Sequence, residues 1–130
     1  MIQKIRLSAS IKIWDRSLSA STIQDAFGLK ASLHHSVGER RKLGDHKPYK
    51  ETYCMFRILG PKLTTSEAAV ERCLDVIEKE KVLRLVRKGG ELYVVIGVFD
   101  RILVDFILEE SLVARLAAAR AGLHIASRTE

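Results

Sequence analysis

The stretch Lys4–Trp14, with the sequence KIRLSASIKIW, decides the fold class of this chain. Its odd-numbered positions are all apolar, and its even-numbered positions as far as Lys12 carry charged or hydroxyl groups. Successive side chains of a β-strand point to opposite faces of the sheet. The alternation therefore predicts a strand with one face in a core and one polar face, and Trp14 falls on the polar parity.

The rest of the chain divides into further strands and helices by periodicity and capping residues. A helix capped by Ser19 or Ser21 is expected to run to Phe27, a second to begin at Thr64, and an alanine-rich helix to run from Glu109 to about Ala121. Val82–Val86 either continues the second helix or begins another. Further strands are expected at Leu29–His35, Thr52–Leu59, Leu92–Phe99, Ile102–Phe106 and Leu123–Arg128.

Two details of these elements bear on the packing. Gly60-Pro61 is expected to break the strand before it. Leu92–Phe99 is apolar on both parities, which predicts a central strand covered on both faces.

Gly-Leu follows a helix at two places, Gly28-Leu29 and Gly122-Leu123. Both glycines are predicted to end their helices with positive φ, because a residue without Cβ adopts that conformation at little cost. The shared plan suggests two strand–helix–strand halves, although Gly-Leu is also a common helix stop. We therefore expect a single α+β domain over residues 1–130, a ferredoxin-like sandwich with an antiparallel or mixed sheet and helices on one face.

Length and composition limit the classes of protein. The chain has 130 residues, of which 47% are hydrophobic and 29% charged, which excludes a disordered tail, a collagen-like repeat and a coiled coil. An apolar run of about 18 residues is absent, so no membrane span is expected. Two cysteines and no visible secretory signal favour a reducing, cytoplasmic location.

The sequence predicts no catalytic residue, cofactor or metal. His34 and His35 are adjacent on an extended segment, so their side chains point to opposite faces. Cys54 and Cys73 fall on predicted core faces, where cysteine behaves as a small hydrophobe. Asp105, Glu109 and Glu110 could pair as carboxylates, but the two glutamates are explained by the helix dipole.

Positive charge is the main functional signal. The formal net charge is +6, which favours contact with nucleic acid or an acidic protein. The candidate binding residues form two sets, Lys4, Arg6 and Lys12 on the polar parity of the first strand, and Arg40, Arg41, Lys42 and Lys47 in the segment that follows Gly38. Together with Trp14 and Tyr49 they could form a basic surface that carries aromatic rings. The second segment has few apolar anchors and is expected to be mobile.

The residues Gly28-Leu29-Lys30-Ala31-Ser32, followed by Gly38-Glu39, carry a family resemblance. With the order of strands and helices from Lys4 to Arg128, the chain resembles the bacterial domain-of-unknown-function family 4279. It departs from the family pattern at Ala31, where proline is usual, at Val37, where a basic residue is usual, and at Tyr53, where tryptophan is frequent. An acidic residue common in the family's last strand is absent near Ala126. The resemblance implies a compact bacterial cytoplasmic domain without assigned activity and transfers no catalytic residues.

Three functional hypotheses follow. A non-enzymatic module that binds a protein partner, regulatory or immunity-like, is the first; a basic nucleic-acid-binding domain is the alternative; a small enzyme is third. A positive groove with exposed aromatic rings would favour nucleic acid, whereas an apolar patch with a polar rim would favour a protein partner.

Overall fold

A computed structural model describes residues 4–42, 44, 46–99 and 106–128. Its elements follow one another as β1 (Ile5–Asp15), α1 (Ala20–Phe27), β2 (Leu33–His35), β3 (Thr52–Thr64), α2 (Ser66–Ile77), α3 (Glu80–Arg87), β4 (Glu91–Val98), α4 (Glu110–Ala118) and β5 (Ala121–Ser127). The predicted strand over Ile102–Phe106 falls almost entirely outside the described residues. None of the described helices is long and apolar enough to cross a membrane.

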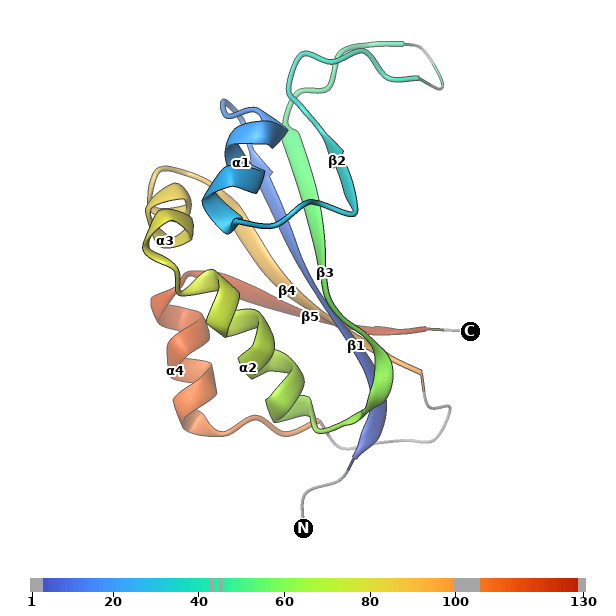
Figure 1. The fold of residues 1–130 in the computed structure, drawn as a ribbon, viewed down its shortest axis with the longest axis vertical. Coiled ribbons are helices and arrows are strands. Elements are labelled where there is room, and N and C mark those ends of the chain that lie inside the picture. Colours follow the sequence, from blue (N-terminus) through green and yellow to red (C-terminus); the bar gives the residue numbers. More distant parts are fainter. Residues whose placement is uncertain (1–3, 43, 45, 100–105, 129–130) are drawn as a thin grey trace.

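The strands form one mixed sheet in the order β2-β3-β1-β4-β5. β1 pairs antiparallel with β3 on one side and with β4 on the other, and β5 runs parallel to β4 at the edge. The helices gather on one face of this sheet (Figure 1). An α+β fold with a mixed sheet and helices on one face is thus confirmed, whereas the ferredoxin-like arrangement and the internal repeat are not.

The core lies between the sheet and the helices. Phe56, Ile96 and Ile11 belong to one buried cluster, as their parity predicted. Every odd-numbered residue of β1 is buried, down to Asp15. Asp15 ends the strand by accepting hydrogen bonds at Oδ1 from the backbone nitrogens of Ser17 (2.8 Å) and Leu18 (2.9 Å). The side chain at this position thereby satisfies two turn amides that the ladder cannot reach.

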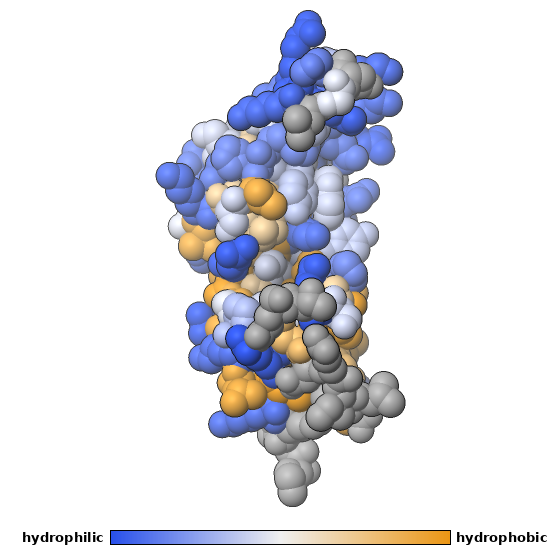
Figure 2. Space-filling model, turned by 90° about the vertical axis from the view of Figure 1, so that its right-hand side faces the viewer, coloured by the Kyte–Doolittle hydropathy of each residue, from blue (hydrophilic) through white to orange (hydrophobic). Residues whose placement is uncertain are grey.

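None of the described helices lies over the opposite face of the sheet. The view in Figure 2 is taken from the side of the molecule away from α2, α3 and α4 and shows strongly hydrophilic side chains at the upper end, where the segment before β3 lies. The prediction that β4 is covered on both faces holds only in part, because Val94, Val95 and Ile96 are all buried although no described helix lies over the face that carries Val95. Tyr93, on the uncovered face of β4, keeps 40% of its surface exposed.

Gly60-Pro61 does not end its strand, contrary to the prediction, because β3 continues to Thr64. The register against β1 shifts in this region, where Leu7 pairs with Lys62 and Ala9 with Leu59. Proline cannot donate to a sheet ladder and is tolerated at bulges and edges. β2 pairs only with residues 53–55 of β3, so Pro61 lies where the outer side of β3 has no neighbouring strand among the described residues.

Helix ends follow the predicted caps only in part. Ser19 caps α1 and accepts a hydrogen bond from Thr22 N, while Thr65 rather than Thr64 caps α2. Gly28 has φ 68° as predicted, but the prediction for Gly122 is wrong. α4 ends earlier, at Ala118, and Arg120 takes the positive φ of 55°.

The two glycines are therefore needed for different reasons. Gly122 lies in β5 opposite Tyr93, and a Cβ built at Gly122 would lie 2.6 Å from the Tyr93 ring. At Gly28 the positive φ is the reason for glycine, since a Cβ there would meet only Lys79 Nζ, at 3.7 Å.

Gly28→Ala is expected to lower the free energy of unfolding by about 1 kcal/mol, because L-residues with a Cβ are strained at positive φ. Urea denaturation of the two proteins measures the difference. Gly28→Asn is the matched control, because asparagine tolerates this conformation better than alanine. A loss as large for asparagine as for alanine would contradict the backbone explanation.

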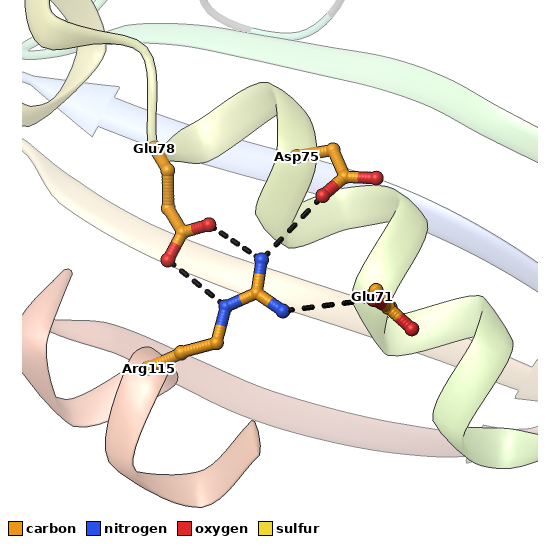
Figure 3. Close-up of polar contacts among 4 residues, drawn as sticks. All are labelled: Glu71, Asp75, Glu78 and Arg115. Atoms are coloured by element: carbon orange, nitrogen blue, oxygen red, sulfur yellow. Dashed lines mark hydrogen bonds and ion pairs between the residues drawn. The ribbon is translucent and has the colours of Figure 1, made fainter. Parts of the chain in front are cut away.

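A cluster of charges joins α4 to α2 on the outside of the helix layer (Figure 3). Arg115 Nε donates a hydrogen bond to Glu78 Oε2 at 3.0 Å, and its Nη2 lies 3.4 Å from Asp75 Oδ1. Glu71 is more distant, at 3.8 Å from Nη1. The hydrogen bond from Arg115 is the main reason that the pKa of Glu78 lies below its usual value.

The stability that Glu78 contributes should depend on pH in a defined direction. A carboxyl group whose pKa is lowered in the folded state adds stability above its ordinary pKa of about 4.3, and the contribution disappears as the pH falls through the lower folded value. Glu78→Gln should therefore cost up to about 1 kcal/mol at neutral pH, as for exposed ion pairs, and less at a second pH well below that ordinary pKa. Urea denaturation at both pH values tests this, and an equal difference at both would contradict it.

Candidate functional site

The even-numbered side chains of β1 lie on the uncovered face of the sheet. Arg6, Ser8, Ser10, Lys12 and Trp14 are all partly or largely exposed, whereas their odd-numbered neighbours are buried. Neighbouring strands add further side chains to this face, as the pairing register shows: Leu33 and His35 from β2, Tyr53, Met55 and Arg57 from β3, Glu91, Tyr93 and Val95 from β4, and His124 from β5. We call this surface the open face.

Five rings form a continuous row across the open face, from Tyr49 through His35, Tyr53 and Trp14 to Tyr93. Tyr49 stacks on His35 with the ring centroids 3.5 Å apart, and His35 lies 5.8 Å from Tyr53. Trp14 lies 5.0 Å from Tyr53 and meets Tyr93 edge-on at 5.8 Å. We call these residues the aromatic row. It crosses four neighbouring strands or their extensions and so runs roughly at right angles to them.

His35 is uncharged in this row at neutral pH. Burial lowers the pKa of its ring below the usual value, and Arg41 acts in the same direction while Glu39 opposes it. Its Nδ1 is buried and has no hydrogen-bond partner among the described residues. Burial likewise raises the pKa of Tyr53, which keeps the phenol neutral. The inner part of the row is therefore a set of neutral flat rings.

The basic segment between β2 and β3 is an arm with its own backbone pairing. Gly38 N donates to Tyr49 O at 2.9 Å, Tyr49 N donates to Glu39 O at 2.8 Å, and Arg41 N donates to Lys47 O at 3.2 Å. The guanidinium of Arg41 lies 5.4 Å from the centre of the Tyr49 ring. We call residues 38–49 the basic arm.

Two buried hydroxyl contacts fix the base of the arm. Thr52 is fully buried, accepts a hydrogen bond from Val37 N at 2.8 Å and donates to Leu18 O. Ser36 Oγ accepts from Ala20 N, also at 2.8 Å. The base of the arm is thereby tied to the loop between β1 and α1, close to the end of the aromatic row.

Two adjoining depressions hollow the open face. The first has a volume of about 460 Å³ and the second about 450 Å³, and Lys12 and Val95 line both. Cations at the first depression are Lys12, Arg57 and Arg128, and none of the described residues that line it is a carboxylate. The second depression is lined by Trp14 and Tyr93 together with Glu51, Glu91 and His124.

Glycines on the open face make room for larger side chains of neighbouring strands. Besides Gly122 under the Tyr93 ring, Gly97 lies beneath Arg128, since a Cβ built on Gly97 would come within 2.9 Å of Arg128 Cγ and 2.5 Å of Ser8 Oγ. Both glycines lie on the open face, and both permit a larger side chain from a neighbouring strand to lie flat across the sheet.

No family model, curated protein or solved structure matches this chain. The geometry of its own side chains therefore carries the functional argument, and its similarity to family 4279 stays a prediction.

The structure divides the predicted binding residues into two groups. Arg6 and Lys12 lie on the open face, and Lys4, which is exposed, directly precedes β1. The other four, Arg40, Arg41, Lys42 and Lys47, lie in the basic arm and are exposed. The arm reaches the open face through Tyr49 and His35, so the two groups border one continuous surface.

Sequence reasoning missed several residues of this surface. Arg57, Arg128 and Tyr93 reach the open face because β3, β5 and β4 lie beside β1, and nothing in the local sequence gives that strand order. The alternating parity of Tyr53, Met55 and Arg57 was a usable signal for β3. The two cysteines are buried as predicted, and burial raises the pKa of Cys54 to about 11 and that of Cys73 to about 12.

Proposed function

We propose that this chain binds single-stranded nucleic acid across the open face. The aromatic row carries the proposal, because it offers flat rings in sequence along a path bordered by Lys12, Arg57 and the basic arm. Proteins that hold single strands combine aromatic rings on which bases stack with a positively charged groove that follows the phosphates. Contact with a nucleic acid would require no catalytic group, and we propose a non-enzymatic binding role.

The arrangement of charge supports a strand rather than a duplex. The Tyr93 ring lies across the sheet over Gly122 and is 40% exposed, so it can stack only on a base that is not already stacked within a double helix. Of the cations of the first depression, Lys12 lies beside the Trp14 and Tyr93 rings, since it also lines the second depression. A strand that follows the row would place bases on the rings and a phosphate at Lys12, and its continuation into the first depression would meet Arg57 and Arg128.

A protein partner is the alternative occupant of the same surface. Leu33 is 59% exposed and lines the first depression together with Met55, Leu59 and Phe99. An acidic protein segment would use these apolar groups with the surrounding cations. Such a segment needs no aromatic row, and for that reason we propose the nucleic acid first and the protein partner second. We further propose that the chain is related to family 4279, that its fold is related to ferredoxin-like sandwiches and that it acts in a bacterial cytoplasm.

Fluorescence anisotropy with labelled single strands of about 12 nucleotides tests the proposal. Oligothymidylate and oligouridylate are expected to bind at neutral pH, with affinity that falls as salt rises by roughly 0.7 logarithmic units for each phosphate contact and each tenfold change in salt. The duplex of the same length is the comparison. Equal or tighter binding of the duplex would contradict the proposal, and binding of a polyglutamate peptide alone would favour the acidic protein partner.

Lys12→Gln is expected to reduce the salt dependence by about one phosphate contact, because Lys12 lies between the two depressions. Lys81→Gln is the matched control, since Lys81 is an exposed lysine on α3 in the helix layer. The control should bind as the wild type does. An equal effect of both substitutions would show that only the net charge matters.

Changing Arg40, Arg41 and Lys42 together to serine is expected to weaken strand binding while the free energy of unfolding changes little. The side chains are exposed, and the pairing of the arm depends on backbone groups at Gly38, Glu39 and Tyr49. The matched control replaces Lys81, Arg87 and Lys88, three exposed cations of the helix layer. Binding that is unchanged by the arm variant would show that the arm does not contact the strand.

A further inference from the structure

The second depression combines aromatic walls with carboxylates, which sets it apart from the first. Trp14 and Tyr93 form the walls, with their rings close to perpendicular at 85°. Glu91 lies directly opposite Trp14 in the β1–β4 pairing, and Glu51 lines the same depression. Within the described part of the chain, neither carboxylate is held in an ion pair or a side-chain hydrogen bond.

A site that only attracted phosphates would gain nothing from these carboxylates. Glu51 and Glu91 repel the backbone of a nucleic acid, yet they lie beside the rings on which a base would stack. Ionised carboxylates are acceptors only, and they pair with groups that present N–H donors. The depression therefore suits a ligand that is flat, stacks on an aromatic ring and offers several N–H donors at one edge.

Among the bases, guanine meets these requirements most fully. Its Watson–Crick edge presents the N1–H and the N2 amino group side by side, so one carboxylate can accept both hydrogen bonds, and its O6 and N7 are acceptors that lysine commonly contacts. Lys12 lines the depression, and its ammonium group carries three N–H donors, so it can supply that contact as well as one to a neighbouring phosphate. Adenine and cytosine offer one amino group each, and uracil and thymine offer a single N3–H between two carbonyl oxygens.

We propose that the second depression recognises guanine, with Glu91 as the acceptor for its N1–H and N2 amino group, Lys12 as the donor to its O6 or N7 edge, and Tyr93 or Trp14 as the stacking surface. This proposal rests on the proposed function, because it gives the open face a base preference. The chemistry would be the same for a guanine within a strand and for a free guanine nucleotide.

The experiment compares oligothymidylate strands that carry one central guanosine, inosine or thymidine. Inosine lacks only the N2 amino group, so it tests the bidentate contact directly. The guanosine strand is expected to bind about 5- to 150-fold more tightly than the inosine strand, the range of a good bidentate pair. Equal affinity for guanosine and inosine would overturn the guanine proposal while leaving strand binding intact.

Glu91→Gln tests whether the Glu91 carboxylate causes the preference for guanosine, as distinct from an effect on strand binding in general. The variant should lose the preference for guanosine over inosine and bind plain oligothymidylate at least as well as the wild type, because a negative charge has been removed. Glu110→Gln, an exposed position at the start of α4, is the matched control and should keep the preference. A preference that survives Glu91→Gln would overturn the assignment of this residue.

Competition with free guanosine monophosphate identifies the source of the base. Displacement of the guanosine strand only at nucleotide concentrations far above the strand's dissociation constant supports recognition of guanine within a strand. Displacement by equimolar nucleotide would overturn the recognition of guanine within a strand and would assign the depression to a free guanine nucleotide. Failure of every strand to bind would contradict the proposed function itself, an outcome distinct from loss of the guanine preference alone.

Discussion

Phe56→Ala is expected to lower the free energy of unfolding by about 3–5 kcal/mol, the usual cost of truncating a buried phenylalanine. Phe56 is 1% exposed, and its ring stacks on that of Phe27 with the centroids 4.3 Å apart. The substitution would open a cavity between β3 and α1, where both rings contribute to the core cluster. Urea denaturation and the thermal midpoint measure the effect.

Leu63→Ala is the control for this prediction, because Leu63 lies on the same strand with 67% of its surface exposed. Its free energy of unfolding should stay within about 0.5 kcal/mol of the wild type. A thermal midpoint for Phe56→Ala within about one or two degrees of that of the wild type would show that the core assignment is wrong.

Tyr93→Ala is expected to weaken strand binding by about 5- to 150-fold, corresponding to the roughly 1–3 kcal/mol that one stacked base contributes. Stability should change little, because the ring lies on the uncovered face and is 40% exposed. Tyr93→Phe keeps the ring and should bind nearly as the wild type does. Anisotropy titrations of the three proteins against one strand make the comparison.

Gly122→Ala tests the same ring without altering it. The added Cβ would lie 2.6 Å from two atoms of the Tyr93 ring, so the ring must move away from its place over β5. Weaker binding by Gly122→Ala with the fold retained would support the position of Tyr93. If both Tyr93→Ala and Gly122→Ala bound the strand with the affinity of the wild type, Tyr93 would not belong to the binding surface.

Local pattern predicted the elements whose signals lie within one segment. The alternation of Lys4–Trp14 gave the strand, its buried parity and the exposed side of Lys12 and Trp14. Gly28 marked the end of α1, and Ser19 was one of the two serines expected to cap its start, because a cap acts on the first or last turn of its own helix.

Features that depend on contacts between distant segments could not be predicted in this way. Val95 is buried although it lies on the face without helices, because residues of neighbouring strands surround it. An apolar run alone cannot tell such a position from one under a helix. The mobility of the basic segment stays a prediction, and the structure adds a contact between distant segments, the stacking of the Tyr49 ring on His35.

The candidate site was predicted as separate sets of cations and completed by topology. Lys12 and Arg41 were found from charge and parity, but Arg57 and Arg128 joined them only through the order β2-β3-β1-β4-β5. Strand order depends on the whole chain, and the parallel pairing of β5 with β4 leaves no local trace in either strand.

Because the described helices cover only one face of the sheet, the inward and outward positions of β1 tolerate substitution to different degrees. Its inward positions, such as Ile11, sit in a close-packed core and tolerate little besides changes that conserve volume. Its outward positions, Ser8, Ser10 and Lys12, have room to exchange one chemical group for another without loss of the fold. A library that randomises these outward positions while retaining the inward ones should therefore yield mostly folded proteins, and the same scaffold can acquire a new ligand through a handful of neighbouring codons.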